Sequence, residues 1–295
     1  MEFLAGRFPD QPDFLLRTLT LYPHPSTSLW RAIEAREIWK EFVNRGVETS
    51  VLDLGCGDGR FSRAVFDRRS IDVGLDISSS AVSLAKQTSN HGLLVVGDGT
   101  RLPFRDGVFG TIFSNSVLEH VPDVPKVLAE ARRVLRRGGV LIFTVPSPNF
   151  TEFLFLPSLL HKIPFLKFLG DWYSRNRNAL LSHHNICEFK LWRSMLESVG
   201  FQGVRGRSCL SKAALQAWDM TAIMIYVLRT PLIRSPNALS LIVSRSQRLR
   251  VFLLRRILGI FYVSANSEGA DLIITAEASL PIIQPLSHEE KADSS

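Results

Sequence analysis

VLDLGCGDGRFSRAVF, residues 51–66, joins a short apolar run to a helical pattern through glycines at alternate positions, Gly55, Gly57 and Gly59. The apolar run is typical of a strand covered on both faces, and RFSRAVF is typical of a helix. Glycines in such a turn let a ligand approach the backbone N–H groups closely. The spacing is GxGxG rather than the GxGxxG of dinucleotide-binding turns, which disfavours a pyrophosphate ligand. A tight turn that binds nothing is the alternative.

The same alternation of strand and helix continues along the chain. A helix at 29–43 precedes the first strand, and apolar runs predict further strands at 71–78, 92–98, 109–115, 140–145 and 270–278. Helical patterns lie between them at 79–89, 124–139 and 187–201. Regular alternation of this kind predicts an α/β fold with a doubly wound, mostly parallel sheet.

The remaining segments suggest additions to this core. We expect an N-terminal helical cap at 1–46, a core at 47–204 and 264–280, and a lid at 150–185. A basic, apolar helical insertion is expected at 205–263, and a polar tail at 286–295. The net charge of the chain is +7, and residues 205–256 alone carry ten Lys or Arg and one acid.

The three cysteines are too few and too scattered for a disulfide scaffold or a zinc motif. We therefore expect reduced thiols, no metal site and a cytoplasmic protein. The first residues show neither a basic leader nor a cleavable apolar run, and no stretch reaches about 18 uninterrupted apolar residues, so neither export nor a spanning helix is expected.

Acidic residues end three successive strands, Asp53, Asp76 and Asp98. Carboxylates crowded at one sheet edge repel one another unless a ligand donates hydrogen bonds to them. Asp76 lies about 20 residues after the glycine turn, where a carboxylate can accept both ribose hydroxyls in this architecture. The pattern predicts a nucleoside-containing ligand, and Ile77, which follows Asp76, is expected to contact it.

Five segments, in this order, resemble the class I S-adenosylmethionine-dependent methyltransferases, especially the branch with ubiquinone and menaquinone biosynthesis enzymes. They are VLDLGCGDGRFS, VGLDIS, VVGDGTRLPF, FGTIFSNSVLEHVPD and EARRVLRRGGVLIFTVPSPN, and they span about residues 48–150. The resemblance implies a seven-stranded, Rossmann-like sheet, S-adenosylmethionine as cofactor and methyl transfer to a small acceptor.

The resemblance also implies roles for single residues. Gly55 and Gly57 would lie against the methionine part of the cofactor, with Gly59 completing the loop. Asp53 would orient that loop or the cofactor's amino group, Asp76 would bind the ribose, and Asp98 with Gly99 would bind the adenine. Ser114 and Asn115 would border the sulfonium.

Methyl transfer from a sulfonium needs a base only when the acceptor must lose a proton, and histidine suits that work. His120 follows the fourth strand, and His183 and His184 precede a later helix. We expect these three as candidate catalytic residues, with capping or solvent exposure as the alternative.

Residues 245–262, if helical, place basic and apolar side chains on different faces. A basic amphipathic helix is typical of a membrane interface, although an added core helix with solvated arginines is equally compatible. We expect a hydrophobic or membrane-delivered acceptor and peripheral membrane contact through 205–263. An RNA substrate is the second hypothesis. It ranks lower because few aromatic residues alternate with the basic ones, unlike in a surface on which bases stack. A methyltransferase-like binding module without turnover is the third.

Overall fold

The structure is a computed structural model, and it describes residues 11–45, 50–67, 69–88, 90–229, 247–265 and 267–279. Seven strands form one sheet in the order β3-β2-β1-β4-β5-β7-β6. Their bounds are β1 Val51–Leu54, β2 Ile71–Asp76, β3 His91–Val96, β4 Phe109–Asn115, β5 Leu135–Pro146, β6 Phe201–Ser208 and β7 Asp271–Ala278. β1 to β5 pair in parallel, and β7 runs antiparallel between β5 and β6. The predicted mostly parallel, seven-stranded sheet is confirmed.

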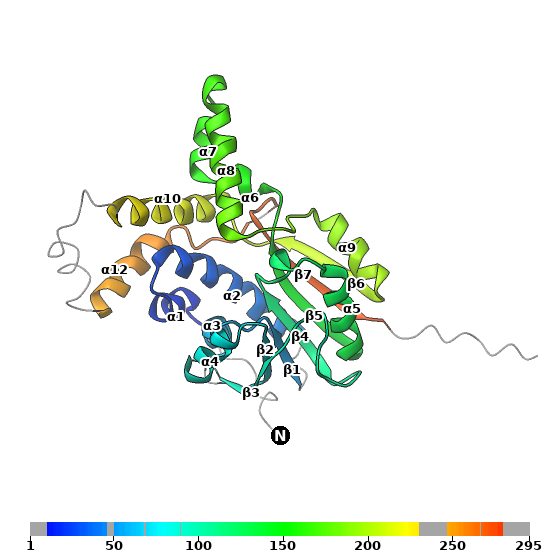
Figure 1. The fold of residues 1–295 in the computed structure, drawn as a ribbon. Coiled ribbons are helices and arrows are strands. Elements are labelled where there is room, and N and C mark those ends of the chain that lie inside the picture. Colours follow the sequence, from blue (N-terminus) through cyan, green and yellow to red (C-terminus); the bar gives the residue numbers. More distant parts are fainter. Residues whose placement is uncertain are drawn as a thin grey trace, which may run out of the picture.

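Helices cover both faces of this sheet, which gives three layers (Figure 1). One face is covered by α1 (Phe14–Leu21), α2 (Pro25–Arg45) and α3 (Arg60–Phe66). The other is covered by α5 (Val124–Val134) and α9 (Phe189–Ser198), while α4 (Ser79–Thr88) packs beside β3 and β2. In α2, Leu29, Ile33, Ile38 and Phe42 are all buried, as their four-residue spacing predicts.

Several boundaries differ from the sequence-based expectation, and two of the differences affect strands β5 and β6. β6 continues to Ser208, four residues past the expected end of the core at 204, because Gly203 and the arginines of FQGVRGRS hide the strand's alternation. α5 ends at Val134, and the backbone of the next five residues already belongs to β5, with Gly138 in a left-handed turn. The helix expected at 124–139 was therefore five residues too long.

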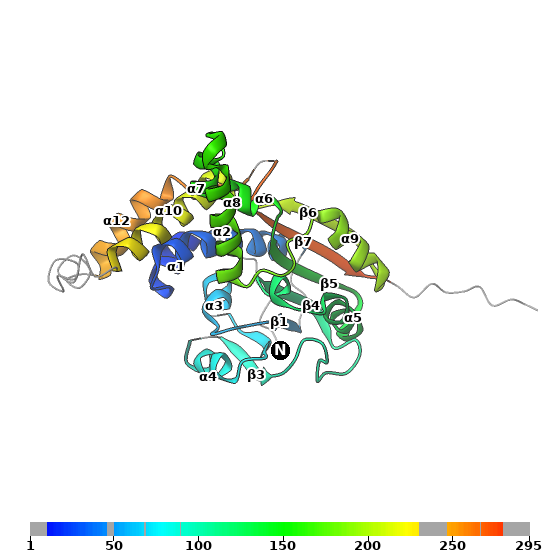
Figure 2. The same ribbon diagram turned by 45° about the horizontal axis from the view of Figure 1, so that its top comes forward.

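The segment expected as a lid forms a helical projection from the body of the molecule (Figures 1 and 2). It comprises α6 (Asn149–Phe153), α7 (Phe155–Leu160), the short η2 (Pro164–Leu166) and α8 (Lys167–Leu181). α7 and α8 pack against each other, and both α6 and α7 contact α10 (Lys212–Arg229). The projection is therefore packed against the body at its base.

The expected basic insertion supplies an outer layer over the N-terminal helices. α10 packs on α2, and α12 (Gln247–Gly259) packs on α1. Val251 and Leu258 of α12 are buried there, whereas Phe252 and Ile257 are more than half exposed. Arg245, which the amphipathic pattern included, lies outside the described residues. Among the helices of the described ranges, none is both long and apolar enough to cross a membrane.

Candidate functional site

A cavity of about 810 Å³ opens at the carboxyl ends of β1, β2 and β3. It is lined by the glycine turn, by the ends of β2 and β3, by the segment after β4, and by residues of α2 and the turn before it. Ligands of open α/β sheets bind at this edge, where the strand order reverses. Here the reversal lies between β1 and β4, next to the glycine turn.

The glycine turn runs so close to the segment after β4 that a side chain has no room. Gly55 has φ +81°, and a Cβ there would lie 2.3 Å from Cγ2 of Val117. The N–H groups of Gly55 and Cys56 donate to the carbonyl of Leu75 at 2.7 and 3.0 Å. Gly57 lines the cavity as well, and Gly59 caps α3 in a left-handed conformation without lining it.

Asp76 both lines the cavity and holds the turn. Its Oδ2 accepts the N–H of Gly57 at 2.8 Å, and its Oδ1 accepts the N–H of Ser78 at 2.8 Å. Each carboxylate oxygen retains a further acceptor position. The exposed side chain of Ile77 lines the cavity beside it.

Asp98 and Gly99 line the same cavity from the end of β3. The Thr100 N–H donates to Asp98 Oδ1 at 2.8 Å, and this bond lowers the pKa of the Asp98 carboxyl. The carboxylate is thus charged at neutral pH and available as an acceptor.

Asp53 is buried and does not line the cavity. Its Oδ2 accepts from the hydroxyl of Ser62 on α3 and lies 2.9 Å from Nε2 of His91 on β3. Gly74 on the intervening strand makes this possible, since a Cβ there would lie 2.7 Å from the His91 ring. Asp53 therefore anchors the helix that follows the glycine turn, and two of the three strand-end acids, not all three, face the cavity.

The two residues expected to border the sulfonium, Ser114 and Asn115, differ in their relation to the cavity. Ser114 is buried, donates to the carbonyl of Leu54 at 2.7 Å and does not line the cavity. Asn115 does line it, and its amide donates to Glu34 at 3.2 Å.

The wall contributed by α2 was not anticipated from the sequence. Arg31 lines the cavity and donates to Glu34 and to the hydroxyl of Ser116, each at 2.6 Å. Burial alone would lower the pKa of Arg31, but the neighbouring Glu34 carboxylate raises it, so the guanidinium is charged. Tyr22, at the turn before α2, lines the cavity too, and burial raises its pKa. An Arg and a Glu three positions apart on a helix are common on surfaces, so no sequence signal distinguished this pair.

Of the three candidate histidines, the structure brings only His120 to the cavity lining. His120 Nδ1 lies 2.9 Å from the carbonyl oxygen of Ser182 at the end of α8. A carbonyl only accepts, so Nδ1 carries the proton and Nε2 of the neutral ring is free to accept one. Nε2 lies 3.7 Å from Oε1 of the buried Glu119, and burial raises the pKa of that carboxyl to about 8.

His183 and His184 lie outside the cavity lining. The ring of His183 packs 5.6 Å from that of His120 and 5.2 Å from that of Phe150, and burial lowers its pKa to about 4. His184 is exposed, and its N–H donates to the carbonyl of Glu119 at 2.8 Å. In the described part of the chain, no cluster of His, Cys, Asp or Glu has the arrangement of a metal site.

Residues 52–143 match the family model of a methyltransferase domain. Demethylmenaquinone methyltransferase of Staphylococcus aureus is 28% identical over 193 residues, which cover 60% of this chain and 79% of that protein. Malonyl-[acyl-carrier protein] O-methyltransferase of Serratia marcescens is 35% identical over 94 residues, 32% of this chain and 37% of that protein. The chain thus matches little more than a third of the Serratia protein's length.

A solved structure shows the same fold over most of the chain. It is a crystal structure of an S-adenosylmethionine-dependent methyltransferase of Thermotoga maritima, described as a possible histamine N-methyltransferase. It superposes with a TM-score of 0.53 and 16% identity, covering 90% of this chain and 92% of that one. The matched family model and the named relatives support a class I, S-adenosylmethionine-dependent methyltransferase domain at residues 52–143, and the solved structure shows that the chain has the fold of such a protein.

Proposed function

We propose that the whole chain transfers a methyl group from S-adenosylmethionine to a small, hydrophobic or membrane-associated acceptor. The observation that carries the proposal is that one cavity is lined both by Asp76 and Asp98 and by His120. A nucleoside-binding edge and a proton acceptor thus border the same volume.

The cofactor would lie along the edge formed by the glycine turn and the ends of β2 and β3. Asp76 would accept the ribose hydroxyls through its remaining acceptor positions, and Asp98 would accept the adenine amino group. Gly99 would supply its N–H to the ring, and Ile77 would cover one side. Asp53 would act indirectly, by holding α3 beneath the turn.

Arg31 would bind the carboxylate of the methionine part. Among the cavity-lining residues that the structure describes, Arg31 is the one Lys or Arg, and Glu34 fixes its position. A charged guanidinium matches a carboxylate in geometry and charge. Asn115 would border the sulfonium from the end of β4.

S-adenosylmethionine, when bound, supplies an electrophilic methyl group with a neutral thioether as leaving group. The protein's own contribution is to align the acceptor with that methyl and to exclude water. Where the acceptor is a hydroxyl, phenol or acidic carbon, Nε2 of His120 would take its proton. His183, neutral at physiological pH, would support the His120 ring by packing, and His184 would contribute only its backbone.

The apolar side chains near His120 support a hydrophobic acceptor. Val117, Val121 and Pro122, which lie within three residues of His120 in the sequence, line the cavity, and Phe61 of α3 lines it as well. The outer layer supports delivery from a membrane surface, because α12 exposes Phe252 and Ile257 together with Arg256. We therefore propose peripheral membrane contact through 205–263.

The proposal is tested by supplying radiolabelled S-adenosylmethionine and the purified protein to a cell extract, which is then separated into lipid, RNA and protein fractions. We expect label in the lipid fraction, and loss of that label with Asp76→Ala. Label in RNA would favour an RNA methyltransferase. Calorimetric binding of the cofactor without transfer into any fraction would favour a binding module without turnover.

A further inference from the structure

We propose that the outer end of the helical projection inserts into the surface of an anionic lipid bilayer. This outer end, called the tip below, comprises residues 159–172: the end of α7, η2 and the first turns of α8. The proposal deepens the proposed membrane contact, and it rests on different residues from those of 205–263.

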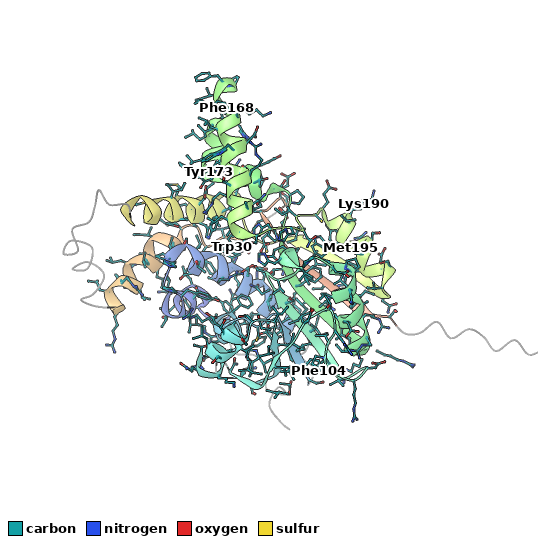
Figure 3. All side chains as sticks on the ribbon, in the orientation of Figure 1. Trp30, Phe104, Phe168, Tyr173, Lys190 and Met195 are labelled. Carbon is teal, nitrogen blue, oxygen red and sulfur yellow. The ribbon has the colours of Figure 1, made fainter. Side chains whose placement is uncertain are left out.

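The tip exposes large apolar side chains. The exposed fractions are 75% for Phe165, 64% for Phe168 and 57% for Trp172. Leu159, Ile163 and Leu169 are also exposed. Figure 3 shows Phe168 near the outer end of the projection, with Tyr173 nearer its base. Isolated exposed apolar residues are ordinary, but a cluster of six at the end of a projection marks an interaction surface.

The base of the projection is held rigidly to α10. The Tyr173 hydroxyl donates to Asp219 Oδ1 at 2.6 Å, the Phe155 N–H donates to Asp219 Oδ2 at 3.1 Å, and Arg177 pairs with Asp219 at 3.2 Å. Asp219 itself is fully buried. Arg177 also lies over the ring of Trp218, 4.5 Å from its centroid. These contacts hold the base of the projection in place, so the tip extends away from the body of the molecule with its apolar side chains exposed.

The charges around the tip select the partner. Residues 155–181 contain four Lys or Arg and a single acid, Asp171. Asp171 pairs with His161 at 3.0 Å, while Lys162, Lys167 and Arg175 are exposed. Lysines that flank an apolar, tryptophan-containing tip match a surface with an apolar interior and anionic head groups. A second copy of the tip would instead bring these cations together.

α8 connects the tip to the cavity. Its 15 residues correspond to about 22 Å along the helix axis. The residue that follows its last turn, Ser182, accepts the hydrogen bond from His120. If the proposed function holds, the inserted tip would keep the cavity close to the bilayer from which the acceptor comes.

Trp172 gives a direct probe of insertion. The other four tryptophans, Trp30, Trp39, Trp192 and Trp218, are at most 9% exposed, so a change on adding vesicles reports on Trp172. The protein is titrated with vesicles of phosphatidylcholine, and with vesicles of phosphatidylcholine mixed with phosphatidylglycerol. We expect a blue shift and quenching by brominated acyl chains with the anionic vesicles, and neither with Trp172→Phe.

Partition coefficients are then compared between matched variants by co-sedimentation. Phe165→Ser with Phe168→Ser should weaken binding to anionic vesicles at least tenfold. Lys162→Glu with Lys167→Glu should weaken it about fivefold or more, less so at high salt. Leu180→Ser is the matched control: Leu180 is 73% exposed but lies at the other end of α8, and its replacement should leave binding unchanged.

Three outcomes would overturn the proposal. The first is equal vesicle binding by the wild type and the tip variants. If binding is then lost only in the variant with Phe252→Ser and Ile257→Ser, the membrane contact belongs to α12 instead. The second is a concentration-dependent dimer that the tip variants abolish, which would make a second copy the occupant. The third is unchanged Trp172 emission with bound vesicles. Cofactor affinity, measured on the same variants, should not change, so failure here leaves the proposed function standing.

Discussion

Replacing Asp76 by Asn should weaken S-adenosylmethionine binding about tenfold to hundredfold. The carboxylate already accepts the N–H groups of Gly57 and Ser78, each at 2.8 Å, which leaves one further acceptor position on each oxygen. Asn keeps one oxygen and replaces the other with a donor. One ribose hydrogen bond is then lost, and a bond to a charged group contributes about 1.5–3 kcal/mol.

Isothermal titration calorimetry measures this change directly. Asp67→Asn is the control, because that carboxylate is 55% exposed and lies 3.8 Å from its partner Arg17. The amide that replaces the Asp76 carboxylate also faces a backbone donor, so the melting temperature of the Asp76→Asn variant should fall modestly. A folded Asp76→Asn protein with wild-type affinity would refute the assignment of the ribose to Asp76.

Four further substitutions test the glycine turn, the base of the projection, the buried Glu119 and the proposed base His120. Gly55→Ala should abolish cofactor binding, because its Cβ would lie 2.3 Å from Val117. Adding Val117→Ala should restore part of the affinity. If no affinity returns, the positive φ of residue 55, and not the contact with Val117, causes the loss of binding. Asp219→Ala should lower the free energy of unfolding by about 3 kcal/mol, measured by urea denaturation, since it leaves the largely buried Arg177 unpaired; a change below about 1 kcal/mol would contradict a rigid base. Burial raises the pKa of Glu119 to about 8, so the wild type should lose stability as the pH rises from about 5 to 8, and Glu119→Gln should not; parallel pH profiles would contradict this. His120→Ala should lower the rate of methyl transfer at pH 7 about a hundredfold or more while cofactor affinity stays constant, unless the acceptor carries no proton to lose.

The core of the fold follows from local pattern. The apolar run at 51–54, the glycine turn and the helical pattern of α2 each predict the element that the structure contains. β6 was missed because Gly203 interrupts its pairing and because Arg205 and Arg207 resemble a solvated segment. An edge strand with one exposed face has little hydrophobic signal to detect.

The cavity was only partly predictable. Asp76 and Asp98 follow from their place at strand ends, since parallel strands bring these ends to one edge. Asp53 is also an acid near the end of a strand. Its orientation depends, however, on the space above Gly74 that admits the His91 ring. Arg31 reaches the cavity only because α2 packs against the sheet, a contact between distant segments that no local pattern records.

The most direct test of the account is the structure of the protein in complex with S-adenosylhomocysteine. We expect an arrangement with the ribose hydroxyls within hydrogen-bond distance of Asp76, the adenine amino group at Asp98 and the carboxylate at Arg31. A ligand bound elsewhere, or an empty cavity in crystals grown with saturating ligand, would contradict it.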